Sequence, residues 1–194
     1  MIQNDDKTYF DYLSKRTLLG LLYRRYYLYP RLDIFLRGKV LDIGCGIGDF
    51  LAYRKQTVGV DINAYNVEYC RRKGFNARLI ENASYPFEDN SFDGAIIDNV
   101  LEHLEDPLPT LSEVCRVLVT YGTLIVGIPG WRGFKSDPDH KKFYSEESMV
   151  KVLHESNFQV RKILHVPFRS SWLYKNMSQY CMYGIFHSTR TLSL

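Results

Sequence analysis

Apolar residues recur along this chain with two periods, one typical of strands and the other of amphipathic helices. From residue 39 onward, short β-rich runs alternate with stretches whose apolar residues lie three or four positions apart, which is the pattern of βαβ units. The alternation predicts an α/β fold in which helices cover both faces of a doubly wound, mostly parallel sheet. The expected strands are 39–43, 57–61, 75–80, 92–98, 123–128 and 158–168, and the expected helices are 49–55, 65–73, 107–118 and 145–156.

Several helix boundaries are marked by residues with defined capping roles. Gly74 stands just past an expected helix end, where a left-handed conformation is common, and Asn157 tolerates the same conformation. Asp106 and Pro107 suit a helix start, because a carboxylate can cap the first turn and proline lacks only an amide that has no partner there. Ser145, followed by two glutamates, predicts another start.

The two ends of the chain follow the pattern less closely. The leucines and tyrosines of 9–29 predict a helix, and the last part predicts a helix over 172–183 and a strand over 185–192. Tyr121–Gly122 is expected to turn the chain into its fifth strand. We expect one domain over 1–194, with an N-terminal helical cap at 1–37, a core at 38–168 and a C-terminal helix and strand at 169–194.

The composition fits a single globular core. Of 194 residues, 45% are hydrophobic and 24% are charged, which is ordinary for a globular domain. The apolar runs are much shorter than the roughly 20 residues that cross a bilayer. The polar, acidic start lacks the basic and apolar regions of a secretory signal, so we expect a cytoplasmic protein. Cys45, Cys70, Cys115 and Cys181 lack paired or metal-ligand spacing, so we expect free thiols and no metal site.

Charge is unevenly distributed, although the net charge is only +3. Residues 41–130 carry 7 basic and 13 acidic side chains, whereas 1–40 carry 8 and 4 and 131–194 carry 10 and 5. An acidic centre suits a cationic cofactor, and basic flanks suit an anionic substrate. Surface charge without a function explains the flanks equally well.

The strongest motif is Val40–Gly48, in which an apolar strand runs into a turn with the spacing Gly-x-Gly-x-Gly. Glycines let the backbone approach a ligand closely, and the helix that follows offers amide donors at its start. A strand that ends in such a turn places the ligand at the carboxyl edge of the sheet. The spacing differs from the Gly-x-Gly-x-x-Gly of dinucleotide loops, and Asp42 just before the turn favours a ligand that carries positive charge.

Asp61 is the second anchor, 19 residues after Asp42 and at the end of the next expected strand. An acid about 20 residues after such a turn accepts hydrogen bonds from ribose hydroxyls. A capping role ahead of Asn63 is the alternative, and the nearby glycine turn favours the ribose role. The two features together predict a cationic nucleoside as the ligand.

These residues resemble motif I of the class I S-adenosylmethionine (SAM)-dependent methyltransferases. Two later stretches extend the resemblance: one runs from Asn82-Ala83 through Pro86-Phe87 to Asp93, and the other is Ile97–Leu104. The likeness covers residues 39–166 and implies a Rossmann-like SAM-dependent methyltransferase that releases S-adenosylhomocysteine. The cofactor-binding residues that it implies are Asp42, Gly44, Cys45, Gly46, Gly48, Asp61, Ile62, Asn82, Ala83, Asp98 and Asn99.

The resemblance also implies separate contacts for these residues. Asp98 and Asn99 are expected beside the methionine end of SAM. Asn82 stands where the family usually has an aspartate that accepts from the adenine amino group.

Two histidines are candidates for catalysis. Methyl transfer mainly needs alignment of the acceptor with the methyl group, and a hydroxyl acceptor also benefits from a general base. His140 follows the fifth expected strand, and its Asp-His context is similar to that of glycan-pathway and small-molecule members of the family. We therefore favour His140 over His103 as the base, and a structural, backbone-bonded role for His103. A capped surface loop is the alternative for His140.

The stretch 9–29, rich in tyrosine and arginine, is expected to cap the cofactor site, as additional N-terminal helices do in this family. Peripheral contact with a membrane surface and plain core packing are alternative uses of it. The sequence shows no zinc, RNP-type or densely basic motif for nucleic acid, so we expect no nucleic-acid partner.

The expected function is methyl transfer from SAM to an oxygen or nitrogen of a small molecule or of a glycan or sugar-nucleotide precursor. The compact chain has no inserted domain for recognising a macromolecule, which favours a small acceptor. A catalytically silent SAM-binding protein with a regulatory or assembly role is the alternative. A nicotinamide-dependent oxidoreductase is disfavoured by the glycine spacing and by Asp42.

Overall fold

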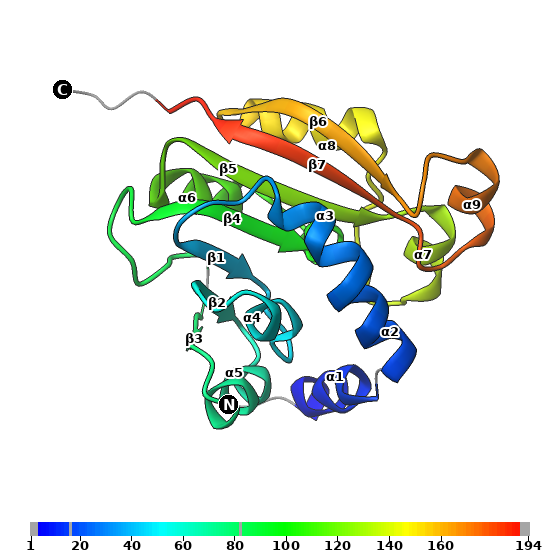
Figure 1. Cartoon of the computed structure of the whole chain (residues 1–194), viewed down its shortest axis with the longest axis horizontal. Helices are drawn as coiled ribbons and strands as arrows, with labels where there is room; N and C mark the ends of the chain where they lie inside the picture. The colour runs from blue at the N-terminus through cyan, green and yellow to red at the C-terminus, as the bar shows by residue number, and fades with distance from the viewer. Residues whose placement is uncertain (1–3, 16, 82, 191–194) are drawn as a thin grey trace.

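The computed structural model describes residues 4–15, 17–81 and 83–190, which form a seven-stranded sheet with helices around it (Figure 1). Within these residues the strand order is β3-β2-β1-β4-β5-β7-β6, and β7 runs antiparallel to both of its neighbours. The other pairings are parallel, as the sequence predicts. The strands are β1 (Val40–Ile43), β2 (Thr57–Asp61), β3 (Ala77–Leu79), β4 (Phe92–Asp98), β5 (Leu118–Pro129), β6 (Phe158–Val166) and β7 (Cys181–Ser188).

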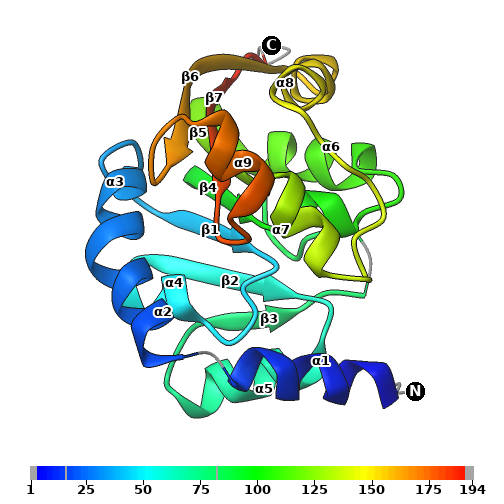
Figure 2. The ribbon, with the colours of Figure 1, turned by 90° about the vertical axis from the view of Figure 1, so that its right-hand side faces the viewer.

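Helices cover both faces of the sheet and the edge at which β1, β2 and β4 end (Figures 1 and 2). They are α1 (Asn4–Ser14), α2 (Leu18–Tyr23), the π-helix η1 (Arg24–Leu28), α3 (Tyr29–Asp33), α4 (Asp49–Tyr53), α5 (Ala64–Arg72), the 3-10 helix η2 (Leu101–His103), α6 (Leu108–Val117), α7 (Trp131–Ser136), α8 (Glu146–Glu155) and α9 (Ser171–Asn176). In the part of the chain that the structure describes, no helix is long and apolar enough to cross a membrane.

The core consists of a layer on each face of the central strands. Leu32 of α3 packs with Ile96 of β4 on one face. On the other face, Leu111 of α6 belongs to one cluster with Leu41 of β1 and Leu124 of β5. Because both faces are covered, β1 and β2 are buried along their whole length, which explains why they are continuous apolar runs in the sequence.

The capping residues act largely as the sequence predicts. Ser145 and Ser148 form a capping box, in which the Ser148 amide donates to Ser145 Oγ at 3.1 Å and the Ser145 amide donates to Ser148 Oγ at 2.8 Å. Gly74 and Asn157 have φ angles of 78° and 64°, as expected just past helix ends. Asp106 Oδ1 accepts from the Leu108 amide at 3.0 Å.

Strand β5 differs from its expectation. It begins at Leu118 rather than at residue 123, and its pairing with β4 jumps from Phe92–Leu118 to Gly94–Thr123. Tyr121 lies in the part between these pairs, with a φ of 61°. The predicted turn is therefore an irregularity inside a longer strand. A turn and a bulge both place a residue at positive φ, so the sequence alone does not separate them.

The predicted helix 9–29 is divided in the structure. The chain makes α1 and then begins again at α2, where Thr17 Oγ1 accepts from the Gly20 amide at 3.2 Å. A threonine with an accepting side chain is an N-cap, and it marks a helix start that the apolar periodicity conceals. The continuation through η1 and α3 carries residues that pack on the sheet, including Leu28 and Leu32.

The predictions for the C-terminal part were partly wrong. The expected helix 172–183 is only α9, and residues 181–183 belong to β7. The expected strand 185–192 is this same β7, which ends at Ser188, and positions 191–192 lie outside the described residues. Helix α7 was not predicted. Insertion of β7 between β5 and β6 gives residues 181–183 strand partners on both sides, and such pairing overrides local propensity.

Candidate active site

The carboxyl ends of β1, β2 and β4 meet at the edge of the sheet that faces the viewer in Figure 2. Strand β1 lies between β2 and β4 and is parallel to both, so Ile43, Asp61 and Asp98 end neighbouring strands. Ligands of open parallel sheets bind outside such an edge. The structure thus brings together residues that the sequence motifs supply one by one.

The three glycines of the turn have different surroundings. Gly44, Gly46 and Gly48 have φ angles of 69°, 53° and 81°, a region that favours glycine. A Cβ on Gly44 would lie 2.5 Å from Val100 Cγ2, and one on Gly48 would lie 2.9 Å from neighbouring side chains. A Cβ on Gly46 would meet only Leu13 of α1, at 3.4 Å. Gly44 and Gly48 therefore serve packing, whereas Gly46 presents bare backbone to the space beneath α1.

Hydrogen bonds within the protein already hold the backbone of this turn. The amides of Gly44 and Cys45 both donate to the Val60 carbonyl, at 2.8 and 3.1 Å. Cys45 is buried, and its Sγ lies 2.7 Å from where a Cβ on Gly59 would stand, so its side chain points into the protein. The turn therefore offers a ligand its shape rather than these two amides.

Asp61 is only 6% exposed and is hydrogen-bonded to the glycine turn. Its Oδ2 accepts from the Gly46 amide at 2.8 Å and from Asn66 Nδ2 at 3.2 Å, and its Oδ1 accepts from the Asn63 amide at 2.8 Å. Burial raises the pKa of Asp61, and these hydrogen bonds oppose the increase. A carboxylate accepts about four hydrogen bonds, so roughly one position is left for a ligand hydroxyl. The capping contact with Asn63 coexists with that role.

Asp42 is the unpartnered carboxylate of this side of the site. It is 4% exposed, and no hydrogen bond joins its side chain to any described residue. Burial raises its pKa well above the usual value, and the nearby carboxylates of Asp98 and Asp61 raise it further. A cationic ligand at this edge would stabilise the charged form of Asp42.

Asp98 is engaged by the protein itself. Its Oδ2 pairs with Arg24 Nη1 at 3.1 Å, and its Oδ1 accepts from Tyr183 Oη at 2.9 Å and from Asn99 Nδ2 at 2.8 Å. Arg24 also approaches Tyr29 Oη at 3.4 Å. Arg24 thus brings a positive charge from η1 to the end of β4, a role that the sequence analysis missed. Its position among tyrosines in an amphipathic stretch gave no signal of a partner 74 residues away.

The expected adenine side lies beyond β2. Ile62 directly follows Asp61 and is 70% exposed, so it offers an apolar surface beside the position expected to bind ribose. Ala83 is half-buried. Asn82, expected to accept from the adenine amino group, lies outside the described residues.

The two candidate histidines meet at the end of β4. The ring centroids of His103 and His140 are 4.6 Å apart, although the residues come from η2 and from the segment between α7 and α8. The His140 ring is stacked on Phe134, and its Nδ1 lies 2.8 Å from the Phe134 carbonyl oxygen. Burial lowers the pKa of His103, and the neighbouring His140 lowers it further.

Glu102 is the second functional candidate that the sequence analysis missed. It is 1% exposed, its Oε1 lies 3.7 Å from His140 Nε2, and neither of its oxygens hydrogen-bonds to another described residue. Burial raises its pKa to about 8. The motif Leu101-Glu102-His103 contains this residue, but only the fold shows that its side chain points inward.

Helix α1 lies against the glycine turn. Figure 2 shows α1 running alongside α5, below β3. Leu13 approaches Gly46, Phe10 stacks on Tyr65, and Asn63 Nδ2 donates to the Asp6 carbonyl at 2.8 Å. A separate cavity of about 390 Å³ lies between η1, α4 and α5, and its lining includes Arg24 and Gly48 but neither Gly46 nor Asp61.

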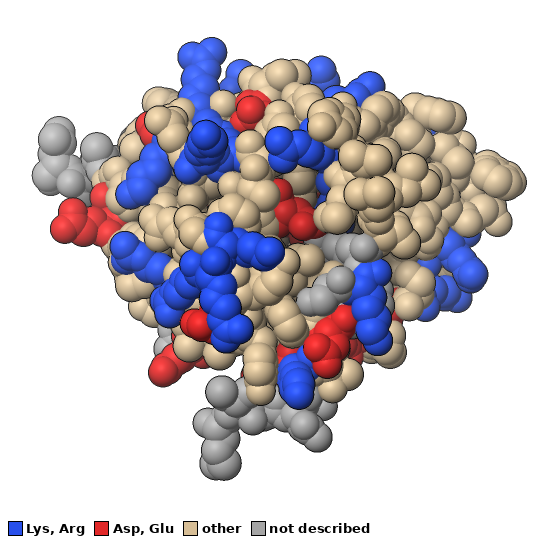
Figure 3. Space-filling model, turned by 60° about the horizontal axis from the view of Figure 1, so that its bottom comes forward, with Lys and Arg blue, Asp and Glu red and all other residues tan. Residues whose placement is uncertain are grey.

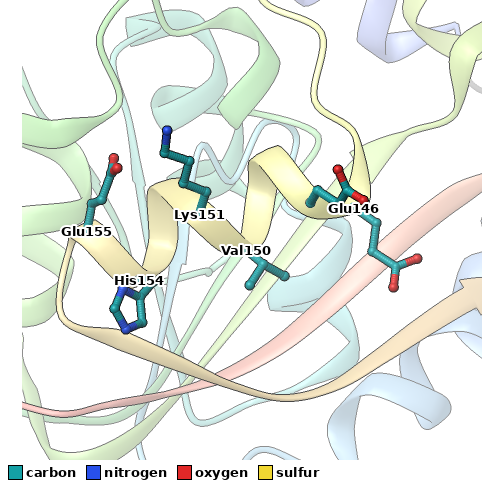
Figure 4. Close-up of a pocket in the computed structure, with 6 residues that line it drawn as sticks. Glu146, Val150, Lys151, His154 and Glu155 are labelled. Carbon is teal, nitrogen blue, oxygen red and sulfur yellow. The ribbon is translucent and has the colours of Figure 1, made fainter.

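A second hollow lies along α8 (Figure 4). Its lining residues, among them Glu146, Lys151 and His154, all belong to this one helix. No strand end contributes to it among the described residues, and none of the sequence motifs reaches it. The hollow is a surface feature of α8 rather than part of the candidate site.

Comparisons with known proteins bear on the domain and the fold in which this site lies. Residues 41–126, which include most of β1, the glycine turn, β2 and β4, match the family model described as "Methyltransferase domain". A crystal structure of a SAM-dependent methyltransferase from Archaeoglobus fulgidus is similar in fold, with a TM-score of 0.70 and 23% identity over 90% of this chain and 99% of that one.

Two curated relatives show how far the sequence similarity extends. An uncharacterised protein of Methanocaldococcus jannaschii is 28% identical over 144 residues, which is 69% of this chain and 70% of that protein. A probable tRNA methyltransferase 9B of Homo sapiens is 34% identical over 108 residues, which is 50% of this chain and 24% of the human protein. The human name does not support the expectation that nucleic acid is excluded as a substrate.

Proposed function

Because residues 41–126 match a methyltransferase family model and the fold is that of SAM-dependent methyltransferases, we propose that this chain is one of them and that it transfers a methyl group from SAM to an oxygen or nitrogen of a small molecule or a glycan precursor. The observation that carries the proposal is the buried carboxylate of Asp42, which has no hydrogen bond to another described residue, in the strand that runs directly into the glycine turn. A carboxylate in that position stabilises a cation, and SAM is a nucleoside whose sulfonium and ammonium groups are cationic.

Each part of SAM has a side chain of suitable chemistry in the site. Asp42 stabilises the cationic methionine end, and Arg24 supplies a guanidinium for its carboxylate. Asp61 accepts from a ribose hydroxyl, and Ile62 packs against the adenine ring. When bound, SAM supplies a methyl carbon made electrophilic by the sulfonium.

On the acceptor side, His140 removes the proton from the acceptor. Because His140 Nδ1 faces the Phe134 carbonyl oxygen, Nδ1 carries the ring hydrogen and Nε2 has the free lone pair. A new bond forms between the acceptor atom and the methyl carbon, the bond from that carbon to sulfur breaks, and the acceptor proton moves to Nε2. Glu102 and Asp137, 3.7 and 3.9 Å from Nε2, orient and stabilise the resulting imidazolium.

A tRNA acceptor is the second candidate, because the human relative is named as a probable tRNA methyltransferase. Exposed basic residues, Arg71, Arg72 and Lys73, adjoin the end of α5. Figure 3 shows Lys and Arg side chains gathered on the face turned to the viewer, with acidic side chains between them. That mixture of signs is weaker than the continuous basic surface typical of nucleic-acid binding, so we favour the small acceptor.

Two measurements test the proposal. Mass spectrometry of the purified protein should detect retained SAM or its demethylated product, and calorimetry should show SAM binding. A labelled-methyl assay should then transfer label into a small-molecule fraction of cell extract rather than into purified tRNA. Label in tRNA alone would establish the second candidate. SAM binding without transfer to any fraction would instead identify a catalytically silent SAM-binding protein.

A further inference from the structure

Three side chains with metal-binding atoms converge at the end of β4. One ligand atom from each of Glu102, His103 and His140 lies within 4.8 Å of the other two. The two segments that supply them are joined by backbone hydrogen bonds, since the amides of Lys141 and Lys142 donate to the Glu102 carbonyl at 2.9 and 3.0 Å. The grouping is therefore built into the backbone rather than produced by mobile surface side chains.

Glu102 gives independent evidence that this cluster binds a ligand. Its side chain is 1% exposed, and both of its oxygens are buried without a hydrogen bond to another described residue. Buried polar atoms in native proteins are nearly always paired, because leaving them unpaired costs free energy. His140 Nε2 lies 3.7 Å from Glu102 Oε1, too far for a hydrogen bond, and Lys141 Nζ pairs with Glu105 at 3.2 Å instead. The pair of free oxygens points to a cation that is not part of the chain.

Both imidazole rings are held in the way that metal-binding histidines are held. Ligating histidines usually donate their other N–H to a carbonyl or carboxylate, which fixes the tautomer and the ring orientation. His140 Nδ1 lies 2.8 Å from the Phe134 carbonyl oxygen, and its Nε2 faces Glu102. His103 has a hydrogen bond to the backbone of Asp139, which leaves its second nitrogen available.

We propose that Glu102, His103 and His140 bind one divalent transition-metal ion, of which Zn²⁺ is the best match. Two imidazoles and a carboxylate are typical ligands of Zn²⁺, and three protein ligands leave a position open for water or for an acceptor. Ligand atoms about 2.0–2.2 Å from one ion lie closer together than the present spacing, so side-chain rotations must bring them inward. The inference departs from the expectation of no metal site, which rested on cysteine spacing.

The ion deepens the proposed function, and its effect on catalysis rests on that function. His140 Nε2 cannot both bind the ion and accept a proton. A bound ion would instead lower the pKa of an acceptor hydroxyl on the open position, and the proton of that hydroxyl would pass to water as its oxygen bonds to the methyl carbon. Binding of the ion itself depends only on the three side chains and can be measured without any methyl acceptor.

The experiment uses the full-length protein after removal of metal with a chelator. Titration with Co²⁺ alone should produce a visible ligand-field absorption band with a 1:1 end point, and added Zn²⁺ should displace it. Glu102→Gln and His140→Ala should each weaken Co²⁺ binding by about 10-fold or more. The control is His154→Ala, because His154 is exposed on α8, outside the cluster (Figure 4).

The outcomes separate this inference from the proposed function. Saturation of wild type and of His154→Ala, with loss in the other two variants, supports the site. No absorption band in wild type, or equal Co²⁺ affinity in all four proteins, overturns it. Glu102→Gln keeps the side-chain volume, so it decides the question if His140→Ala does not fold by circular dichroism. SAM binding is measured in parallel, and its failure would count against the proposed function and not against the metal site.

Discussion

Two buried carboxylates at the same sheet edge, Asp61 and Glu102, differ in the number of hydrogen bonds that they accept from the protein. Asp61 is 6% exposed and accepts three hydrogen bonds, two of them from backbone amides. Glu102 is 1% exposed, and neither of its oxygens hydrogen-bonds to another described residue. Burial raises the pKa of both groups, and for Glu102 the value reaches about 8.

The difference shows that the two halves of the site are prepared to different degrees. On the β1–β2 side, hydrogen bonds within the chain fix the glycine turn and Asp61 before a ligand arrives, so little reorganisation is needed on binding. On the β4 side, Glu102 lies 3.7 Å from His140 Nε2, but neither of its oxygens has a hydrogen bond to another described residue. We expect substitutions on the first side to affect mainly cofactor affinity, and those on the second to affect turnover and metal binding.

Gly46→Val should give the largest effect. The side chain would occupy the space beneath α1 where the backbone is bare, so SAM affinity should fall by about 100-fold or more, a loss of roughly 3 kcal/mol. Gly74→Val is the matched control: Gly74 also has a positive φ, but nothing lies within 4 Å of its Cβ position. Both variants should lose about 1–2 kcal/mol of stability from backbone strain. If calorimetry finds normal SAM binding in Gly46→Val, SAM does not bind against the backbone of Gly46.

Asp61→Ala should weaken SAM binding by about 2 kcal/mol, because a ribose hydroxyl loses its acceptor and the turn loses its brace. The Gly46 and Asn63 amides would both lose their partner, so the melting temperature should fall as well. Asp89→Ala is the control, since Asp89 is an exposed carboxylate bound to Arg116 and Arg190. Equal SAM affinity in the two variants would remove Asp61 from the cofactor site.

His140→Ala tests the β4 side of the site. Turnover should fall by about 100-fold, the lower end of the range for a lost acid–base group, while the dissociation constant of SAM stays nearly constant. His154→Ala should behave as wild type. If SAM affinity falls by the same factor as turnover, His140 contributes to cofactor binding, and the β4 side of the site is not functionally separate from the β1–β2 side. Steady-state kinetics combined with calorimetry distinguishes these results.

Asp42→Asn should give the smallest effect, and one that depends on pH. The pKa of Asp42 is raised in the folded protein, so above its unfolded value of about 3.9 the native state keeps a proton that the unfolded state releases. Wild-type stability is therefore lost as pH rises from that value toward the folded pKa. The variant lacks this dependence, so its advantage in melting temperature should grow between pH 4 and pH 8. A constant difference over that range would contradict the assignment, and SAM affinity should fall a few-fold.

Much of the fold could be predicted because its signals are local. The apolar runs of β1 and β2, the capping Ser145 and the turn-forming Gly74 each act within a few residues of themselves. The position of β7 could not be predicted, because a strand inserted antiparallel between β5 and β6 depends on partners that are distant in the chain. The same reason explains the errors over residues 172–192.

In the candidate site, too, features with local signals could be predicted from the sequence, and contacts between distant residues could not. By itself the sequence determined the glycine turn with Asp42 and Asp61, because these groups sit on adjacent strands and their spacing follows from one βαβ unit. Only the tertiary structure decided that Arg24 reaches Asp98, and that Glu102 is buried against His140. Burial and pairing across tens of residues depend on how the layers pack, and no local pattern of residues encodes that.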